Sequence, residues 1–261
     1  MVGADYQAVT ETAGVRITRE ALAMALTRYV LAAGFCDGKR VLEAGCGAGQ
    51  GLGILARRAA CVVGGDYDPR LIAAAGRHYR ERAGLVRLDA QALPFADHSF
   101  DVVILFEAIY YIARPDRFVS EARRVLDRAG TLIVCSANPE RADFNPSPFS
   151  TRYLSARELA GLMRAEGFEP QLAGAFPIDH VSMRGRTIAT LRKGAIAMGL
   201  MPKTMKGKQL LKRLFMGRLV EAPTELEGDT GTVEELSPLA LDQPAKAYKV
   251  IFAVGRLSVA P

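Results

Sequence analysis

The feature that most constrains the fold of this chain is a set of three glycines at alternate positions, Gly45, Gly47 and Gly49. The apolar residues Val41 and Leu42 just before them predict the end of a buried strand. Glycine tolerates positive φ and lets a ligand approach the bare backbone, so the glycines predict a tight turn from this strand into a helix. Amides at the start of such a helix form a polar, slightly positive pocket. Tight turns without a ligand share this spacing, so the flanking elements decide its meaning.

Strand and helix patterns alternate along the chain. Apolar runs predict strands over 61–66, 85–88, 100–106, 130–136, 168–176 and 247–254, and helical spacing predicts helices over 18–33, 51–58, 69–82, 116–127 and 155–165. Together with the strand before the glycines, this order predicts an α/β fold with a doubly wound, mostly parallel seven-stranded sheet. Ligands in such folds bind at the carboxyl ends of the strands.

Composition and length fit one domain. The chain has 261 residues, 49% of them hydrophobic, enough for a single α/β domain with an insertion. We divide it into an N-terminal helical cap (1–38), a core (39–176), a basic helical insertion (177–245) and a final strand (246–261). Within the insertion, the composition of residues 221–244 predicts a polar linker. The start lacks the pattern of a signal peptide, and the four cysteines are scattered without a CxxC pair. We therefore expect a cytoplasmic protein with reduced thiols and no metal site.

Carboxylates stand where the predicted strands end. Asp66 ends the second strand about twenty residues after the glycines, where an acidic group commonly binds both hydroxyls of a ribose. A helix-capping or solvated role is the structural alternative for Asp66. Asp89 follows the third strand and is placed to accept a hydrogen bond from an adenine amino group. No GxxxxGK[ST] pattern follows a strand, and the glycine spacing is GxGxG rather than GxGxxG, which argues against a nucleoside triphosphate or a nicotinamide dinucleotide.

The positive charge is concentrated in one segment. The net charge is +6, but residues 180–220 contain ten Lys or Arg and no Asp or Glu, so the remainder sums to 6 − 10 = −4. The spacing of apolar and basic residues over 209–219 predicts a basic amphipathic helix. Three interpretations remain open for residues 184–220: a lid packed on the domain, a peripheral membrane contact, or binding of an anionic substrate. Nucleic acid is disfavoured because no aromatic-rich platform accompanies the charges.

Four stretches resemble a known family. Residues 41–49 are similar to motif I of class I S-adenosylmethionine-dependent methyltransferases, and 63–69 resemble the second motif. The run from Asp89 through Leu93-Pro94-Phe95 to Asp101 is similar to the third motif, and 106–108 to the start of the fourth. The resemblance implies a Rossmann-like methyltransferase fold, S-adenosylmethionine as cofactor, S-adenosylhomocysteine as product, and no metal.

The resemblance also implies cofactor-binding residues. Glu43 would orient the glycine loop or meet the methionine amino group, and Asp66 would bind the ribose hydroxyls. Tyr67 would pack on the adenine, and Asp89 with the Ala90 amide would bind its polar edge. The full implied set is Glu43, Gly45, Cys46, Gly47, Asp66, Tyr67, Asp89, Ala90 and Glu107.

The catalytic and acceptor residues are less determined. Many relatives carry a histidine two residues after the position of Ala108, where this chain has Tyr110 and Tyr111. Our catalytic candidates are therefore His180, which Asp179 would assist, and Tyr110. Candidates for contacting the acceptor are Tyr29, Tyr111, Asn145 and Tyr153.

The expected reaction is methyl transfer to an oxygen, or else a nitrogen or carbon, of a small molecule such as a secondary metabolite or a sugar. One alternative is a lipid or quinone methyltransferase that docks on membranes through its basic helices. Another is a non-catalytic module that binds S-adenosylmethionine. The sequence is compatible with a monomer or a homodimer.

Overall fold

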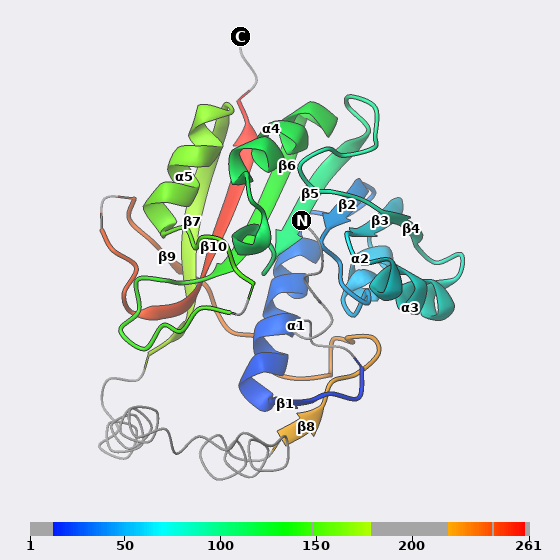
Figure 1. The fold of residues 1–261 in the computed structure, drawn as a ribbon, viewed down its shortest axis with the longest axis horizontal. Coiled ribbons are helices and arrows are strands. Elements are labelled where there is room, and N and C mark those ends of the chain that lie inside the picture. The colour runs from blue at the N-terminus through cyan, green and yellow to red at the C-terminus, as the bar shows by residue number, and fades with distance from the viewer. Residues whose placement is uncertain (1–12, 148, 179–218, 242, 259–261) are drawn as a thin grey trace.

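An eight-stranded sheet forms the centre of the fold, in the order β4-β3-β2-β5-β6-β10-β7-β9 (Figure 1). The computed structural model describes residues 13–147, 149–178, 219–241 and 243–258. The strands of the sheet are β2 (Arg40–Ala44), β3 (Cys61–Asp66), β4 (Gly84–Arg87), β5 (Phe100–Phe106), β6 (Leu126–Ala137), β7 (Phe168–Pro177), β9 (Ser237–Pro238) and β10 (Tyr248–Leu257).

The sheet is parallel over its first five strands and mixed beyond them. β2 pairs in parallel with β3 and β5, β3 with β4, and β5 with β6. β10 runs antiparallel between β6 and β7, with Phe252 opposite Cys135 on one side and Ala173 on the other. The predicted α/β class and mostly parallel core are confirmed. The predicted strand count of seven is one short, because the two residues of β9 are too few to carry a periodic signal.

Helices cover both faces of the sheet. α1 (Arg19–Ala33), α2 (Leu52–Ala56) and α3 (Pro69–Tyr79) pack on one face, and α4 (Pro115–Val125) and α5 (Ala156–Ala165) pack on the other. Strand residues alternate between the two cores: Ile104 belongs to the first and its neighbour Leu105 to the second. A capping box begins α5, since the Ser155 side chain accepts from the Glu158 amide and the Glu158 side chain accepts from the Ser155 amide.

The segment after residue 218 differs from the prediction. Residues 219–245 were expected to end a helical insertion and to continue as a polar linker, but their described part contains two strands and no helix. β8 (Leu219–Glu221) pairs antiparallel with β1 (Arg16–Thr18), beside the start of α1 (Figure 1). Prolines at 223, 238 and 244 oppose a helix because they lack the backbone donor. His180, Asp179 and the basic stretch up to 218 lie outside the described residues.

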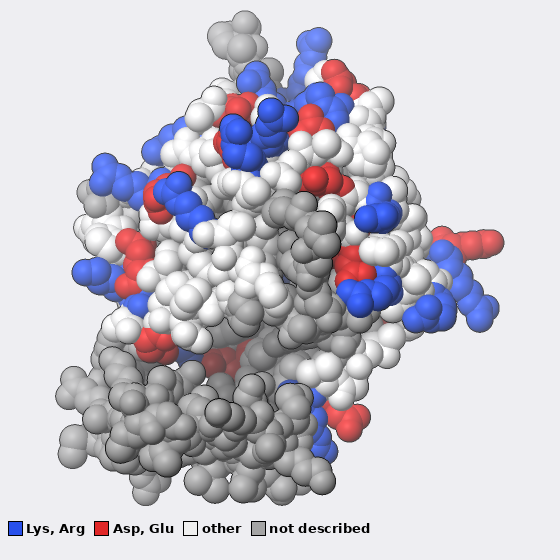
Figure 2. Space-filling model, viewed as in Figure 1, with Lys and Arg blue, Asp and Glu red and all other residues white. Residues whose placement is uncertain are grey.

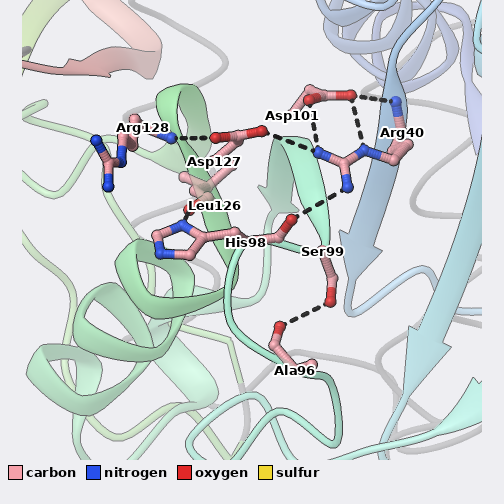
Figure 3. Close-up of polar contacts among 8 residues, drawn as sticks. All are labelled: Arg40, Ala96, His98, Ser99, Asp101, Leu126, Asp127 and Arg128. Carbon is pink, nitrogen blue, oxygen red and sulfur yellow. Dashed lines mark hydrogen bonds and ion pairs between the residues drawn. The ribbon is translucent and has the colours of Figure 1, made fainter.

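A polar cluster joins three strands at their amino ends, away from the carboxyl ends where a ligand would bind (Figure 3). The backbone amide of Arg40 donates to Asp101 Oδ2 across 2.8 Å, and its Nη2 donates to Asp101 Oδ1 at 2.9 Å and to Asp127 Oδ2 at 3.2 Å. Arg40 begins β2, and the two aspartates are second in β5 and β6. These hydrogen bonds and ion pairs therefore stabilise the register of the three central strands.

Charges on the described surface are mixed. Figure 2 shows basic and acidic residues interspersed over the described part of one face, around a broad uncharged area. On this face the described residues thus carry no single basic field.

Candidate functional site

A cavity of about 890 Å³ opens at the carboxyl ends of the parallel strands. Of the nine predicted cofactor residues, only Glu43 is not part of its wall. The polar and aromatic wall consists of Arg28, Tyr29, Gln50, Asp66, Tyr67, Asp89, Gln91, Phe106, Glu107, Tyr110, Tyr111, Arg141, Phe149, Thr151 and Lys249. The structure thus brings together residues from all parts of the core and from α1 and β10.

The glycine loop lies against β3. Gly45 and Gly47 have φ values of +78° and +57°, in the left-handed region that favours glycine. The amides of Gly45 and Cys46 both donate to Gly65 O, at 2.7 and 2.9 Å. A Cβ at Gly45 would lie 3.0 Å from Ala108 Cβ, so a larger residue would press on the wall of the cavity. The loop therefore presents backbone rather than side chains to a ligand.

Asp66 is held by the backbone around it. Its Oδ2 accepts from the Gly47 amide and its Oδ1 from the Asp68 amide, each at 2.9 Å. Burial raises the pKa of Asp66 above its usual value. A carboxylate has about four acceptor sites, so these backbone hydrogen bonds leave capacity to accept from a ligand such as a diol. This is the capacity that the predicted ribose contact requires.

Asp89 and Tyr67 lie nearer the solvent. Asp89 is exposed, and its Oδ1 accepts from the Gln91 amide at 2.9 Å and from Gln91 Nε2 at 3.2 Å. The ring of Tyr67 is 50% exposed, with the Arg87 guanidinium carbon 5.7 Å from its centre. Both residues form an open end of the cavity, beside Ala90.

Glu43 is buried behind the cavity. The Tyr29 hydroxyl donates to Glu43 Oε1 across 2.6 Å, whereas Glu43 Oε2 has no hydrogen-bond partner among the described residues. Burial raises the pKa of Glu43 to about 7, and burial together with this carboxylate raises the pKa of Tyr29. Because Glu43 does not line the cavity, its predicted contact with a methionine amino group stays a prediction. The predicted contact of Tyr29 with the acceptor stays a prediction, because the Tyr29 hydroxyl donates its hydrogen bond to Glu43.

Glu107 meets two residues at the end of β5. It has a φ of +51°, unusual for a side chain larger than glycine. The Tyr110 hydroxyl donates to Glu107 Oε2 at 2.8 Å, and Arg28 Nη1 lies 3.5 Å from Glu107 Oε1. Arg28 was not among the sequence candidates. Arg28 follows Met24 by four residues on the predicted first helix and precedes Tyr29. This helical spacing was the signal that could have placed Arg28 beside them.

Aromatic side chains form the far wall. Tyr110 and Tyr111 lie in the short helix η2 (Ile109–Tyr111) and line the cavity. The rings of Tyr110 and Tyr153 stack with centroids 4.3 Å apart, and the Tyr153 hydroxyl accepts from the Ser147 amide at 3.0 Å. Tyr153 and the exposed Asn145 do not line the cavity. Their predicted contacts with the acceptor are therefore not supported by this arrangement.

Tyr110 is a donor in this arrangement. Burial and the Glu107 charge raise its pKa well above the usual value, which keeps the hydroxyl protonated. Its catalytic role therefore stays a prediction, as a hydrogen-bonding group rather than a base. His180, the other catalytic candidate, lies outside the described residues. In the part of the chain that is described, no three His, Cys, Asp or Glu side chains gather as a metal ion would need.

Part of the chain is similar to known methyltransferases. Residues 42–134 match the family model described as a methyltransferase domain. A probable S-adenosylmethionine-dependent methyltransferase of Mycolicibacterium smegmatis is 39% identical over 140 residues, which are 51% of this chain and 53% of that protein. A fatty-acid O-methyltransferase of the same organism is 42% identical over 107 residues, 40% of this chain and 39% of that protein. The chain spans about half the length of the first curated relatives it matches.

Solved structures share the fold. A Thermotoga maritima structure, described as a SAM-dependent methyltransferase and possible histamine N-methyltransferase, has a TM-score of 0.57 at 20% identity and covers 89% of both chains. At that identity the likeness concerns the fold alone. None of the helices in the described ranges is long and apolar enough to cross a membrane.

Proposed function

We propose that this chain, whose residues 42–134 match the family model of a methyltransferase domain, is a class I S-adenosylmethionine-dependent methyltransferase that transfers a methyl group to an oxygen of a small organic acceptor. The observation that carries the proposal is the convergence of Asp66, Glu107 and the glycine loop on one cavity.

The residues of the cavity suit each part of the cofactor. Asp66 has acceptor sites left for the ribose hydroxyls, and the glycine backbone leaves room beside them. Glu43 does not line the cavity, and its hydrogen bond from Tyr29 suits it to orient the strand that leads into the glycine loop. Arg28, close to Glu107, would bind the carboxylate of the methionine part. Tyr67 and Asp89 would bind the adenine at the open end.

The main task of the protein in this reaction is to position the acceptor atom against the methyl group. When bound, S-adenosylmethionine supplies a methyl group on a sulfonium, whose leaving group is a neutral thioether. Holding the acceptor atom in line contributes up to roughly 7–11 kcal/mol in favourable cases. Tyr110 and Glu107 lie where the methionine part would end. Because the Tyr110 hydroxyl donates its proton to Glu107, we assign Tyr110 the task of orienting the acceptor by accepting a hydrogen bond from it.

An oxygen acceptor is supported by the relatives. The M. smegmatis protein that is 42% identical over 107 residues is named as an O-methyltransferase of fatty acids. We therefore add a lipid to secondary metabolites and sugars as a substrate class for this chain. A cytoplasmic location and a membrane contact through residues 184–220 stay predictions.

The test begins with calorimetric titration of the purified chain with S-adenosylmethionine and S-adenosylhomocysteine. We expect both to bind. Incubation with methyl-labelled S-adenosylmethionine and a panel of carboxylic acids, phenols and sugars should then label an oxygen of one class. Absence of binding would overturn the proposal. Binding with no transfer to any acceptor would favour a non-catalytic module.

A further inference from the structure

The charged wall of the cavity is divided between two ends. The acidic residues Asp66, Asp89 and Glu107 follow β3, β4 and β5, where the cofactor would bind. Arg141, beyond the end of β6, and Lys249, at the start of β10, line the other end. That end belongs to the acceptor, because the proposed function assigns the first end to the cofactor.

The partners of these two cations lie outside the cavity wall. Arg141 Nε is 3.5 Å from Asp143 Oδ1, and the Asp143 side chain is 55% exposed. Lys249 Nζ is 2.5 Å from Glu20 Oε1, whose side chain is 51% exposed. Ion pairs with such exposed carboxylates contribute little because water screens them. Both cations therefore retain the capacity to bind an anion inside the cavity.

The cations themselves are mostly shielded from solvent. The side chains of Arg141 and Lys249 are only 20% and 23% exposed. Arg141 Nε is buried and donates no hydrogen bond to any residue that the structure describes. A buried donor without an acceptor is unfavourable, and an oxyanion at the guanidinium would satisfy it.

A buried asparagine fixes the backbone that carries both cations. Asn138 is fully buried, and its Nδ2 donates to Ala245 O at 2.6 Å and to Tyr248 O at 2.8 Å. Its backbone amide donates to Lys249 O at 3.0 Å. These bonds tie the loop that begins three residues before Arg141 to the strand that carries Lys249. Asn138 is thus a positioning residue for the pair.

We propose that Arg141 and Lys249 bind an oxyanion group, a carboxylate or a phosphate, of an otherwise apolar acceptor. The apolar part follows from the neighbouring wall, where Ala137, Val250, Ile112 and Phe149 line the same cavity. The inference rests on the proposed function and names the substrate class of that site.

The anion site is an anchor for the acceptor rather than the site of reaction. β10 is two strands from β5 in the sheet order, and neighbouring strands are about 4.8 Å apart. The start of β10 is therefore on the order of 10 Å along the sheet from Glu107, beside which the methyl group would lie. An acceptor held by its anion at this distance would place a second polar atom near Tyr110.

The experiment measures binding of octanoate, octyl phosphate and the neutral octanamide to the full chain, by calorimetry, with and without saturating S-adenosylhomocysteine. We expect at least one of the two anions to bind about tenfold tighter than octanamide. Arg141→Gln and Lys249→Gln should each remove most of that preference. Arg164→Gln and Lys246→Gln, which change exposed residues outside the cavity, should leave it unchanged.

Each outcome has a defined meaning. A preference for octanoate alone identifies a carboxylate anchor, and a preference for octyl phosphate alone identifies a phosphate anchor. Equal affinity for anions and octanamide, binding of none of the probes, or an anion preference that survives both cavity substitutions overturns the inference. Failure of S-adenosylhomocysteine to bind would instead overturn the proposed function, and the anion preference of the ligand-free chain would still be measured.

Discussion

The Tyr29 hydroxyl donates to Glu43 Oε1 across 2.6 Å inside the core, which joins α1 to the strand that leads into the glycine loop. Fourteen residues separate the two along the chain, and both are buried. The bond leaves the second oxygen of Glu43 as an unused acceptor just behind the cavity. This hydrogen bond therefore connects the packing of α1 with the position of the glycine loop.

Glu43→Gln should change how stability depends on pH. Burial raises the pKa of Glu43 from 4.5 to about 7, so the folded protein holds this proton more tightly than the unfolded chain. The free energy of unfolding of the natural protein should therefore fall, relative to that of Glu43→Gln, as pH rises from 4.5 to about 7. We expect a relative change on the order of 2 kcal/mol, measured by urea unfolding across this range. Parallel pH profiles for the two proteins would contradict the assignment.

Asp66→Ala should weaken cofactor binding without unfolding the domain. The substitution removes the acceptor that the two ribose hydroxyls would use, and each charge-assisted hydrogen bond contributes about 1.5–3 kcal/mol. We expect the Kd for S-adenosylhomocysteine to rise by at least about tenfold in calorimetry. Asp229→Ala, at an exposed residue outside the cavity, is the matched control. An unchanged Kd in Asp66→Ala would remove the ribose contact.

Glu225→Ala should loosen the segment that follows β8. Glu225 Oε2 lies 2.6 Å from His78 Nε2 and accepts from Arg82 Nη2 at 2.9 Å, so it ties this segment to α3 and the turn after it. The adjacent Leu226 is buried and lines the cavity. We expect faster hydrogen exchange of the 222–226 amides and weaker binding of S-adenosylhomocysteine.

The neighbouring substitution Glu227→Ala serves as control, because that side chain is exposed. Gly53→Ala should reproduce the Glu225→Ala effect, since a Cβ at Gly53 would collide with the Glu225 carboxylate. Unaltered exchange in both variants would show that the segment is held by other contacts.

Asn138→Ala should destabilise the protein by about 2–3 kcal/mol. It leaves the carbonyls of Ala245 and Tyr248 without their shared donor in a fully buried position. Chemical denaturation would measure the loss, with the exposed Asn145→Ala as control. A loss no larger than that of the control would mean that water replaces the side chain and that Asn138 does not set the geometry of Arg141 and Lys249.

The predicted polar linker shows where sequence patterns fall short. Residues 221–244 carry few apolar residues, so their composition indicates a loose connection. In the structure, the Leu226 amide donates to Gln50 O at 2.7 Å, and Gln50 Nε2 donates to Pro223 O at 2.7 Å. Buried Ala222 and Leu226, the pairing of β9 with β7 and the ion pairs of Glu225 also hold the segment. None of these contacts has a period that a sequence reveals.

The sequence by itself determined which residues stand at the carboxyl ends of the parallel strands. Strand and helix periods are local, and parallel pairing brings the ends of adjacent strands to one edge, so Gly45, Asp66 and Glu107 were predictable. Only the tertiary structure decided that Arg28 meets Glu107, and that Arg141 and Lys249 line one cavity. These pairs are 79 and 108 positions apart, and contacts of that kind depend on how helices and strands pack rather than on any local pattern.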